Sequence, residues 1–269
     1  MTRHVASVDD ADRIRLITFR RPEARNAFDT PLYDAVANAL NEVAERDDLA
    51  VVVLTGEGTA YSAGQDLAEM GRLGNPEHRD EATQAQAESH GFARFIAAIE
   101  SFPKAIVAAV NGVAVGLGTT MLPYCDIVLA SEQARFRLPF ASLGVVPEAG
   151  SSYTLPMVMG WRAAAYALFT AEWFDAQDAL AWGLVSRVCP HDALLDEAMD
   201  VARAIAKMPI VSLVETKRLL LANRLEAARA ARLREEEVFA RLTGAPANRE
   251  AIAAFLEKRE PDFTALGAE

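Results

Sequence analysis

Two glycine-containing turns, each preceded by an apolar run, most constrain the fold of this chain. The first turn, residues 62–67, follows the apolar run 50–56, and the second turn, residues 111–118, follows the run 105–110. Each run is typical of a buried strand, and each turn leads toward a predicted helix. Alternating strands and helices favour right-handed crossovers and a sheet that is at least partly parallel. We therefore expect an α/β fold.

The same two turns predict a place for negative charge. A turn between a strand and a helix points free backbone N–H groups into a cleft, and the helix dipole favours an anion there. Two such turns can hold one oxyanion between them. Glu148 follows in an apolar loop at residues 144–152. If that loop is buried, desolvation raises the pKa of Glu148 and suits it to proton transfer, whereas a helix cap or an exposed loop carboxylate is an equally open interpretation.

Composition narrows the function classes. The chain has 269 residues, of which 51% are hydrophobic and 24% charged, so a packed core is expected. The net charge of -11 argues against a nucleic-acid surface. Cys125 and Cys189 do not resemble a disulfide framework, which favours a reducing compartment. Because the first residues lack an apolar signal core and no run is long enough to span a bilayer, we expect a soluble cytoplasmic protein.

Periodicity predicts the remaining elements. Thr30 is expected to cap a helix over residues 30–45, and the polar stretch 73–88 is expected to form a loop. From residue 161 onward nearly every segment has helical spacing, which predicts a helical region appended to the core. We place the boundary between residues 190 and 191. The other expected helices are 90–101, 119–123, 163–169, 176–182, 192–207, 210–222, 225–242 and 249–258, and the other expected strands are 13–19, 127–130 and 185–188.

Several motifs have structural explanations. Asp66 is expected to cap the helix that follows it, with Glu69 reaching back as in a capping box. Ser151 and Ser152 are expected to cap a helix that starts near residue 153. The glycines of the second turn fail the spacing of a dinucleotide or phosphate loop. No nucleophile elbow is present, and the four histidines have no metal-like spacing, so no metal site is expected.

Motifs along nearly the whole chain resemble the crotonase superfamily, also called the enoyl-CoA hydratase/isomerase family. Apart from the two turns, these motifs are Arg21-Pro22 with Asn26-Ala27, and residues 125–130, 143–147, 181–185 and 251–259. The resemblance implies a spiral of ββα turns followed by a helical trimerisation region. It also implies a homotrimer, with two trimers pairing into a hexamer as the alternative. Neither a nucleic-acid nor a membrane partner is expected.

The resemblance implies an acyl-CoA thioester as substrate, with no metal or separate cofactor because coenzyme A belongs to the substrate. Backbone N–H groups of Gln65 and Leu117 match the two oxyanion-hole positions of the family. Lys258 is expected to reach coenzyme A from a neighbouring helix or subunit. The segments expected to line the coenzyme A pocket contribute Ala24, Arg25, Ala27, Ala63, Gly64, Asp66 and Leu67.

Two departures from the family pattern indicate a subclass. Hydratases of the family carry acids at positions that are Thr120 and Phe140 here, whereas Glu148 stands where hydratases usually have glycine. This pattern resembles the Δ3,Δ2-enoyl-CoA isomerases, in which one carboxyl group moves a proton from C2 to C4 of a 3-enoyl thioester. The alternatives are another crotonase-fold enzyme, such as an enoyl-CoA hydratase, and a non-catalytic acyl-CoA-binding protein.

Overall fold

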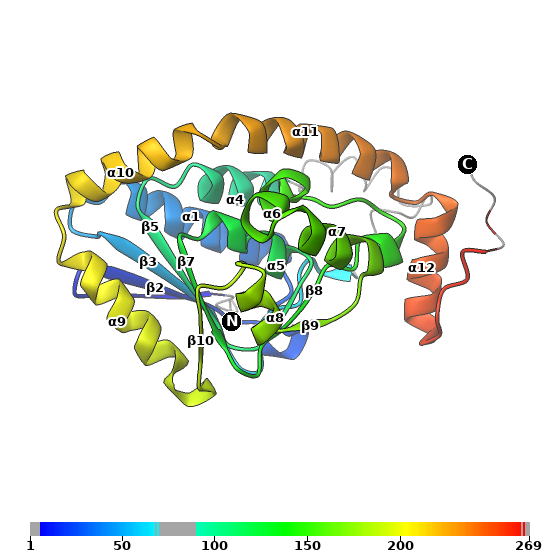
Figure 1. Cartoon of the computed structure of the whole chain (residues 1–269), viewed down its shortest axis with the longest axis horizontal. Helices are drawn as coiled ribbons and strands as arrows, with labels where there is room; N and C mark the ends of the chain where they lie inside the picture. Colours follow the sequence, from blue (N-terminus) through cyan, green and yellow to red (C-terminus); the bar gives the residue numbers. More distant parts are fainter. Residues whose placement is uncertain (1–5, 68, 70–89, 265, 267–269) are drawn as a thin grey trace.

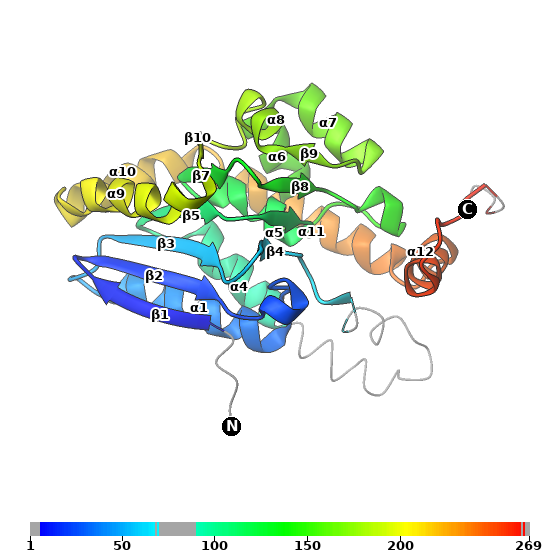
Figure 2. The ribbon, with the colours of Figure 1, turned by 90° about the horizontal axis from the view of Figure 1, so that it is seen from below.

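A six-stranded sheet forms the centre of the molecule (Figure 1). The structure is a computed structural model and describes residues 6–67, 69, 90–264 and 266. Neighbouring strands in the sheet are parallel except β1 and β2, which confirms the α/β prediction. Figure 2 shows the strands in their spatial order, which is β1 (Ala6–Ala11), β2 (Ile14–Phe19), β3 (Val51–Gly56), β5 (Ala105–Val110), β7 (Ile127–Ser131) and β10 (Arg187–Cys189).

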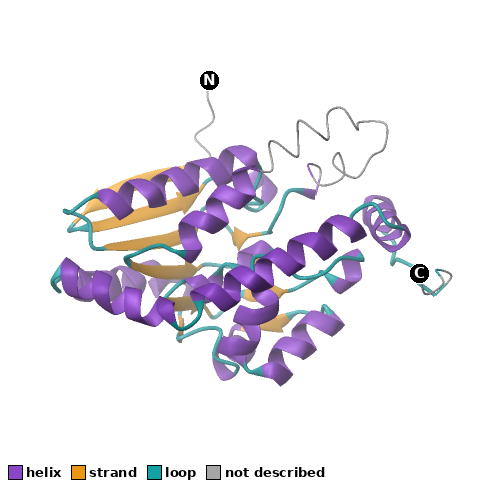
Figure 3. Ribbon diagram, turned by 90° about the horizontal axis from the view of Figure 1, so that it is seen from above, coloured by secondary structure: helices purple, strands orange, loops and turns teal. Residues whose placement is uncertain are grey.

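Helices cover both faces of this sheet (Figure 3). On β3, Val52 and Leu54 pack into the cluster that contains the apolar side chains of α1 (Thr30–Glu45) and α4 (His90–Glu100). Val51 and Val53 point the other way, into the cluster formed with α9 (Leu194–Ala206). Alternation of side chains along a strand therefore explains why β3 is wholly buried and reads as a continuous apolar run.

A second sheet of four very short strands lies next to the first. Its strands were not predicted, because segments of two or three residues carry no measurable period. Neighbouring strands are parallel except the last pair. In order they are β4 (Ala60–Ser62), β6 (Val113–Val115), β8 (Arg135–Arg137) and β9 (Phe174–Asp175). Since β4 and β6 pair in parallel and each leads into a glycine turn, the sheet brings both turns to one edge.

Most of the remaining helices follow the predicted pattern. Those at residues 210–222 and 225–242 have the predicted ends, and the helix predicted at 249–258 begins three residues earlier. Their bounds are α5 (Leu117–Thr120), α6 (Ser151–Met159), α7 (Trp161–Thr170), α8 (Ala176–Ala181), α10 (Ile210–Ala222), α11 (Leu225–Leu242) and α12 (Pro246–Glu257). Short 3-10 turns occur at Pro22–Ala24, Leu122–Tyr124, Ala141–Leu143 and His191–Ala193.

Several local predictions needed correction. The α1 helix is capped by Asp29, whose side chain accepts from the Leu32 N–H, and Thr30 is its first residue. The helix predicted at 119–123 is α5 followed by a 3-10 turn, and the strand predicted at 185–188 is β10, which begins at Arg187. Ala6–Ala11 is an additional strand that was not predicted, because its exposed acidic residues interrupt any apolar pattern. The polar stretch 73–88 lies outside the described residues.

The first helix of the predicted appended region packs on the central sheet. Ala198 and Ala202 of α9 are buried in the same cluster as strand residues. By contrast, α10 leaves Val211, Leu219 and Leu220 exposed. The boundary at residues 190 and 191 stays a prediction, as does the assembly that these exposed side chains suggest. No helix among the described residues has both the length and the hydropathy needed to cross a membrane.

Candidate active site

The two glycine turns are in direct contact. A Cβ atom on Gly64 would lie 2.5 Å from the carbonyl oxygen of Val115, and one on Gly118 would lie 2.4 Å from that of Ser62. Both contacts are too short for any side chain, and Gly64 also has a φ of 86°. Glycine at these two positions therefore allows the turn after β4 to touch the turn after β6.

This contact places two backbone N–H groups at one cavity. Leu117 is the first residue of α5, so its N–H has no acceptor within the helix. On the other turn, the backbone hydrogen bonds to Phe28 are made by the two neighbours of Gln65. The Phe28 N–H donates to the Gly64 carbonyl, and the Asp66 N–H donates to the Phe28 carbonyl. Within the described part of the chain neither Gln65 N–H nor Leu117 N–H has a protein acceptor. Both are therefore free to bind an oxygen atom.

The cavity at the turns is narrow and mainly apolar. Its volume is about 80 Å³, and Glu148 is its acid among the described residues. Glu148 thus shares one cavity with Gln65 and Leu117, as sequence reasoning required but could not show. The residues that line it are Ala63, Gly64, Gln65, Leu67, Val115, Gly116, Leu117, Pro139, Phe140, Leu143, Val145, Glu148 and Phe239.

The environment of Glu148 favours a protonated carboxyl group. Burial raises the pKa of Glu148 to about 8, and the negative charge of Glu235 acts in the same direction. A hydrogen bond from the Thr120 hydroxyl to Glu148 Oε1, at 3.1 Å, opposes this rise. The sequence-based expectation of a desolvated carboxyl group therefore agrees with the structure, and the group is poised to exchange a proton near neutral pH.

Contacts from distant segments fix the loop that carries Glu148. Ala149 and Gly150 both have positive φ, at 59° and 70°, which is unfavourable for alanine. The Tyr124 hydroxyl donates to the Ala149 carbonyl at 2.5 Å. Glu235 of α11 accepts from the Gly150 and Ser152 N–H groups at 2.6 and 2.7 Å. Sequence reasoning missed Tyr124 and Glu235, because nothing local connects them to this loop.

The expectation that Ser151 and Ser152 cap a helix near residue 153 was wrong. Helix α6 begins at Ser151 and its N-cap residue is Gly150, which has no side chain to cap the helix. The carboxylate of Glu235 takes the place of a capping side chain. Because negative charge is stabilised at a helix N-terminus, a buried glutamate from another helix can serve this purpose.

The segment expected to line the coenzyme A pocket lies beside the first turn. The carbonyl oxygen of Arg25 accepts from the Ala63 N–H at 2.9 Å, while the Arg25 side chain is exposed. Buried Asn26 fixes the segment from within, since its amide donates to the Ala60 carbonyl at 2.7 Å. Ala27 is buried and Ala24 is half-buried, whereas the Arg25 side chain between them is exposed.

Asp66 has the structural role expected of it, with one difference. Its carboxyl group accepts from the Glu69 N–H at 3.4 Å and pairs with Arg21 at 3.1 Å. The Glu69 carboxyl group accepts from the Thr30 hydroxyl, and the Asp66 N–H donates to Phe28. The reciprocal half of the predicted capping box is therefore absent. Leu67 follows in the cavity wall.

Lys258 lies outside the cavity that contains Gln65, Leu117 and Glu148. It ends α12 with a φ of 56°, is exposed, and does not line the cavity. Its role stays a prediction that involves a second subunit. The described residues contain no cluster of three or more His, Cys, Asp and Glu side chains able to hold a metal ion. Cys125 and Cys189 are free and buried, and burial raises the pKa of Cys125 to about 12.

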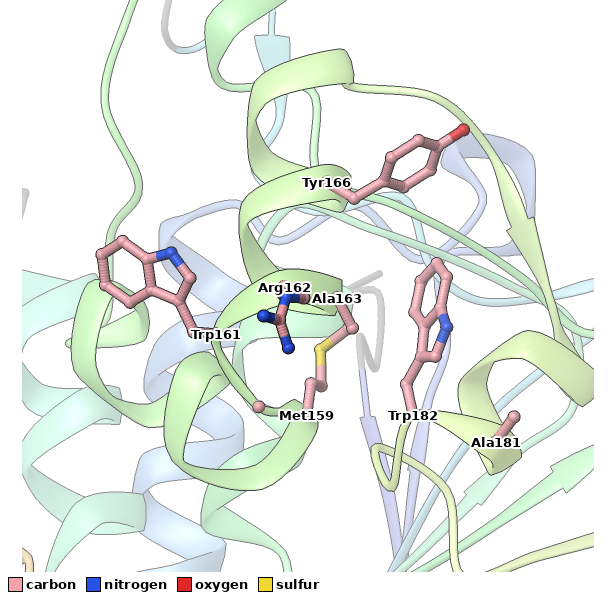
Figure 4. A pocket seen from close by; sticks show the side chains of 8 residues that line it. Met159, Trp161, Arg162, Ala163, Tyr166, Ala181 and Trp182 are labelled. Carbon is pink, nitrogen blue, oxygen red and sulfur yellow. The ribbon is translucent and has the colours of Figure 1, made fainter.

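A larger open groove of about 820 Å³ occurs between α6, α7 and α8 (Figure 4). Tyr166 and Trp182 form an edge-to-face pair along it, with ring centroids 6.2 Å apart. Trp161 stands on the opposite side in Figure 4 and is exposed. Because none of the predicted site residues lines this groove, the smaller cavity at Glu148 remains the candidate active site. The groove is lined by Met159, Gly160, Trp161, Arg162, Ala163, Tyr166, Ala181 and Trp182.

Comparison with known proteins agrees with this geometry. The family model described as enoyl-CoA hydratase/isomerase matches residues 9–265. The chain belongs to the enoyl-CoA hydratase/isomerase family. A crystal structure of an enoyl-CoA hydratase/isomerase from Pseudoalteromonas atlantica superimposes with a TM-score of 0.87 at 36% identity, covering 96% of this chain and 99% of that one. The crotonase fold is thereby confirmed.

Curated relatives within the enoyl-CoA hydratase/isomerase family carry different activities. The 2,3-dehydroadipyl-CoA hydratase of Escherichia coli is 35% identical over 95% of this chain and 97% of its own length. The human enoyl-CoA delta isomerase 2 is 37% identical over 75% of this chain and 50% of its own length. Family membership therefore supports an enzyme acting on acyl-CoA thioesters, and residues in the site must distinguish hydration from isomerisation.

Proposed function

We propose that this protein is a Δ3,Δ2-enoyl-CoA isomerase in which Glu148 is the only acid and base. The observation that carries the proposal is the chemistry of the cavity around Glu148. Thr120 and Phe140 occupy the positions where the resemblance places the two hydratase acids. Thr120 donates a hydrogen bond to Glu148, and Phe140 lines the cavity. Hydration normally uses two acids to activate water and protonate carbon, whereas a double-bond shift requires one.

In the proposed reaction the Glu148 carboxylate removes a proton from C2 of a 3-enoyl thioester. The C2–H electron pair forms a C1–C2 double bond, and the carbonyl π electrons move to the thioester oxygen, which then carries the dienolate charge. Backbone N–H groups of Gln65 and Leu117 would bind that oxygen. The protonated Glu148 then delivers its proton to C4: the C3–C4 π pair forms the new C4–H bond, the C1–C2 pair moves to C2–C3, and the carbonyl re-forms. Loss of one such donor typically costs about 3 kcal/mol of barrier.

The pKa of Glu148 supports this shuttle. With a pKa of about 8, the group is mostly protonated at neutral pH in the free protein, yet its ionised form is readily reached. A pKa near the working pH balances the ability to accept a proton against the ability to return it. A fully exposed glutamate, with its usual pKa near 4.3, would be a much weaker base.

The proposal includes how the substrate and the subunits are held. Arg25, Ala24, Ala27 and the turn at residues 63–67 would bind coenzyme A, and Lys258 would add a contact across a subunit boundary. We propose a homotrimer, with pairing to a hexamer as the alternative, because α10 and α12 leave apolar side chains exposed. A monomer seen by light scattering at micromolar concentration would refute it. A cytoplasmic location fits the two free, buried thiols.

Hydratase activity remains the second candidate, because hydratases occur among relatives that span nearly the whole chain. Purified protein should be given a 3-enoyl-CoA, and the conjugated product followed by ultraviolet absorbance. Water addition to trans-2-enoyl-CoA should be assayed in parallel by loss of the same absorbance. Isomerisation without comparable hydration would support the proposal. Hydration as the main activity would make the protein a hydratase instead. If the protein catalyses neither reaction, a non-catalytic acyl-CoA-binding protein is the remaining alternative.

The role of Glu148 requires a matched pair of variants. Glu148→Gln should keep the fold and acyl-CoA affinity but lose isomerisation at or beyond the top of the range of about 10²–10⁴-fold that a general acid–base group typically contributes, because a carboxamide cannot accept and return the proton. The exposed Glu132 provides the control, and Glu132→Gln should retain full activity. Near-normal turnover by Glu148→Gln would identify another residue as the base.

A further inference from the structure

We propose that Glu235 of α11 is a positioning residue for Glu148, holding the backbone beneath it so that its carboxyl group faces the cavity. This inference rests on the proposed function of Glu148. Glu235 is 85 residues away along the chain from Gly150, with which it makes a hydrogen bond. It is 6% exposed, so the backbone of the α6 N-terminus is where its charge is satisfied.

The first line of support is geometric. The two oxygens of Glu235 accept from different N–H groups, one of Gly150 and one of Ser152, which lie just after Glu148 in the chain. A carboxylate can accept both bonds at once, whereas an amide side chain has a single acceptor oxygen. Glu235 therefore holds the left-handed Ala149–Gly150 pair, which sets the direction in which Glu148 leaves the backbone.

The second line of support is the close packing of α11 against this loop. A Cβ atom on Gly150 would lie 2.9 Å from the Ala228 carbonyl oxygen and 2.8 Å from the Tyr124 hydroxyl. Ala228 and Glu235 are seven residues apart, so they share one face of the helix, and Ala231 between them is also buried. Small side chains bring α11 close, and the next turn supplies Phe239 to the cavity wall. One helix thus carries both the support of Glu148 and part of its pocket.

The third line of support is electrostatic. The charge of Glu235 raises the pKa of Glu148, in addition to the larger effect of burial. Burial likewise raises the pKa of Glu235 itself. Removing Glu235 should therefore both loosen the loop and lower the pKa of Glu148. Among the described residues, the charge of Glu236 also raises the pKa of Glu235. The charge of Glu148 contributes to the raised pKa of Tyr33, and Tyr124 lies near Glu100, Glu235, Arg232 and Arg224.

The test compares Glu235→Gln and Glu235→Ala with Glu237→Gln, an exposed residue on the same helix. The first variant removes the charge and keeps one acceptor, and the second removes both acceptors. We expect kcat for 3-enoyl-CoA to fall by roughly 10–100-fold in Glu235→Ala, and by less in Glu235→Gln, because small displacements of a reacting group carry penalties of this size. KM should change by less than about threefold, since the thioester contacts are elsewhere, and Glu237→Gln should match the wild type.

A readout independent of turnover separates this inference from the proposed function. Carbon-13 NMR of protein labelled at glutamate carboxyl groups can follow the titration of Glu148, with the resonance assigned by its loss in Glu148→Gln. The midpoint should move to lower pH in both Glu235 variants and stay fixed in Glu237→Gln. This result supports positioning even if the wild type does not isomerise 3-enoyl-CoA. An unchanged midpoint in Glu235→Gln, with or without loss of kcat, would overturn the inference.

Discussion

The hydroxyl group of Thr120 donates a hydrogen bond to Oε1 of Glu148 across 3.1 Å. It comes from the first helical turn after the second glycine turn, so the two site elements are bonded through side chains as well as backbone. The bond lowers the pKa of Glu148 and opposes the effect of burial. A hydroxyl here stabilises the carboxylate that would remove a proton from substrate, without offering a second acid.

Thr120→Val should therefore shift the pH dependence of the reaction. Without the hydroxyl, the pKa of Glu148 should rise by about one to two units, because a hydrogen bond to a charged group contributes about 1.5–3 kcal/mol. The rising limb of kcat/KM against pH should move to higher pH by that amount. Thr120→Ser keeps the hydroxyl and should keep the wild-type profile. Identical profiles for the Val and Ser variants would exclude the proposed effect of this bond.

Gly64→Ala should disrupt the site by separating the two turns. The new methyl group would meet the Val115 carbonyl oxygen at 2.5 Å, and the Gln65 N–H next to it would move. We expect kcat/KM to fall by about 10²–10³-fold, the loss typical of one oxyanion-hole donor. Gly160→Ala is the matched control, because Gly160 also has positive φ, at 75°, but open space around it. An equal loss in both variants would assign the effect to backbone strain alone.

Arg25→Ala should weaken binding of acyl-CoA more than it slows the chemical step. The exposed guanidinium lies on the segment that is bonded to the first turn through its backbone, so removing the side chain leaves that bond intact. KM should rise several-fold, with little change in kcat, and higher salt should reduce the difference from the wild type. Calorimetry should show the same loss for coenzyme A itself. A fall in kcat at constant KM would contradict a binding role.

Glu148→Gln should stabilise the fold increasingly as pH rises. The pKa of Glu148 is about 8 in the folded protein, against an ordinary value of 4.5. Between these values the folded protein holds a proton that the unfolded chain has released, so the contribution of Glu148 to stability is present below pH 4.5 and is lost as pH rises through 8. Thermal unfolding should show the Tm of the variant, relative to wild type, increasing from pH 5 to 9. A pH-independent difference would mean that Glu148 is not desolvated.

Isomerisation in heavy water should retain some hydrogen from substrate C2 at C4 of the product. One carboxyl group carries the proton between the two carbons, and its enclosure in a narrow cavity slows exchange with solvent. Mass spectrometry of the product would measure the retained fraction. Complete deuteration at C4 under single-turnover conditions would favour separate donors or free solvent access.

The sequence by itself determined the elements with a long, regular period. The apolar spacing of residues 210–222 and 225–242 gave helix ends that match α10 and α11, and the run 105–110 matches β5. The sequence also identified Glu148 and the two turns, because glycines after apolar runs and a lone acid in an apolar loop are local features. Local patterns suffice where the structure depends on neighbours three or four positions apart.

Only the tertiary structure decided how these features meet. The pairing of β4 with β6 brings the turns together, and three-residue strands leave no period in the sequence. Glu235 caps α6 in place of the predicted serines, although it lies 83 residues from Ser152 in the chain. It reaches the start of α6 because α11 packs against α6. The pKa of Glu148 is likewise a property of its enclosure. Such contacts join segments that are far apart in the chain, so their energies are set by packing rather than by local sequence.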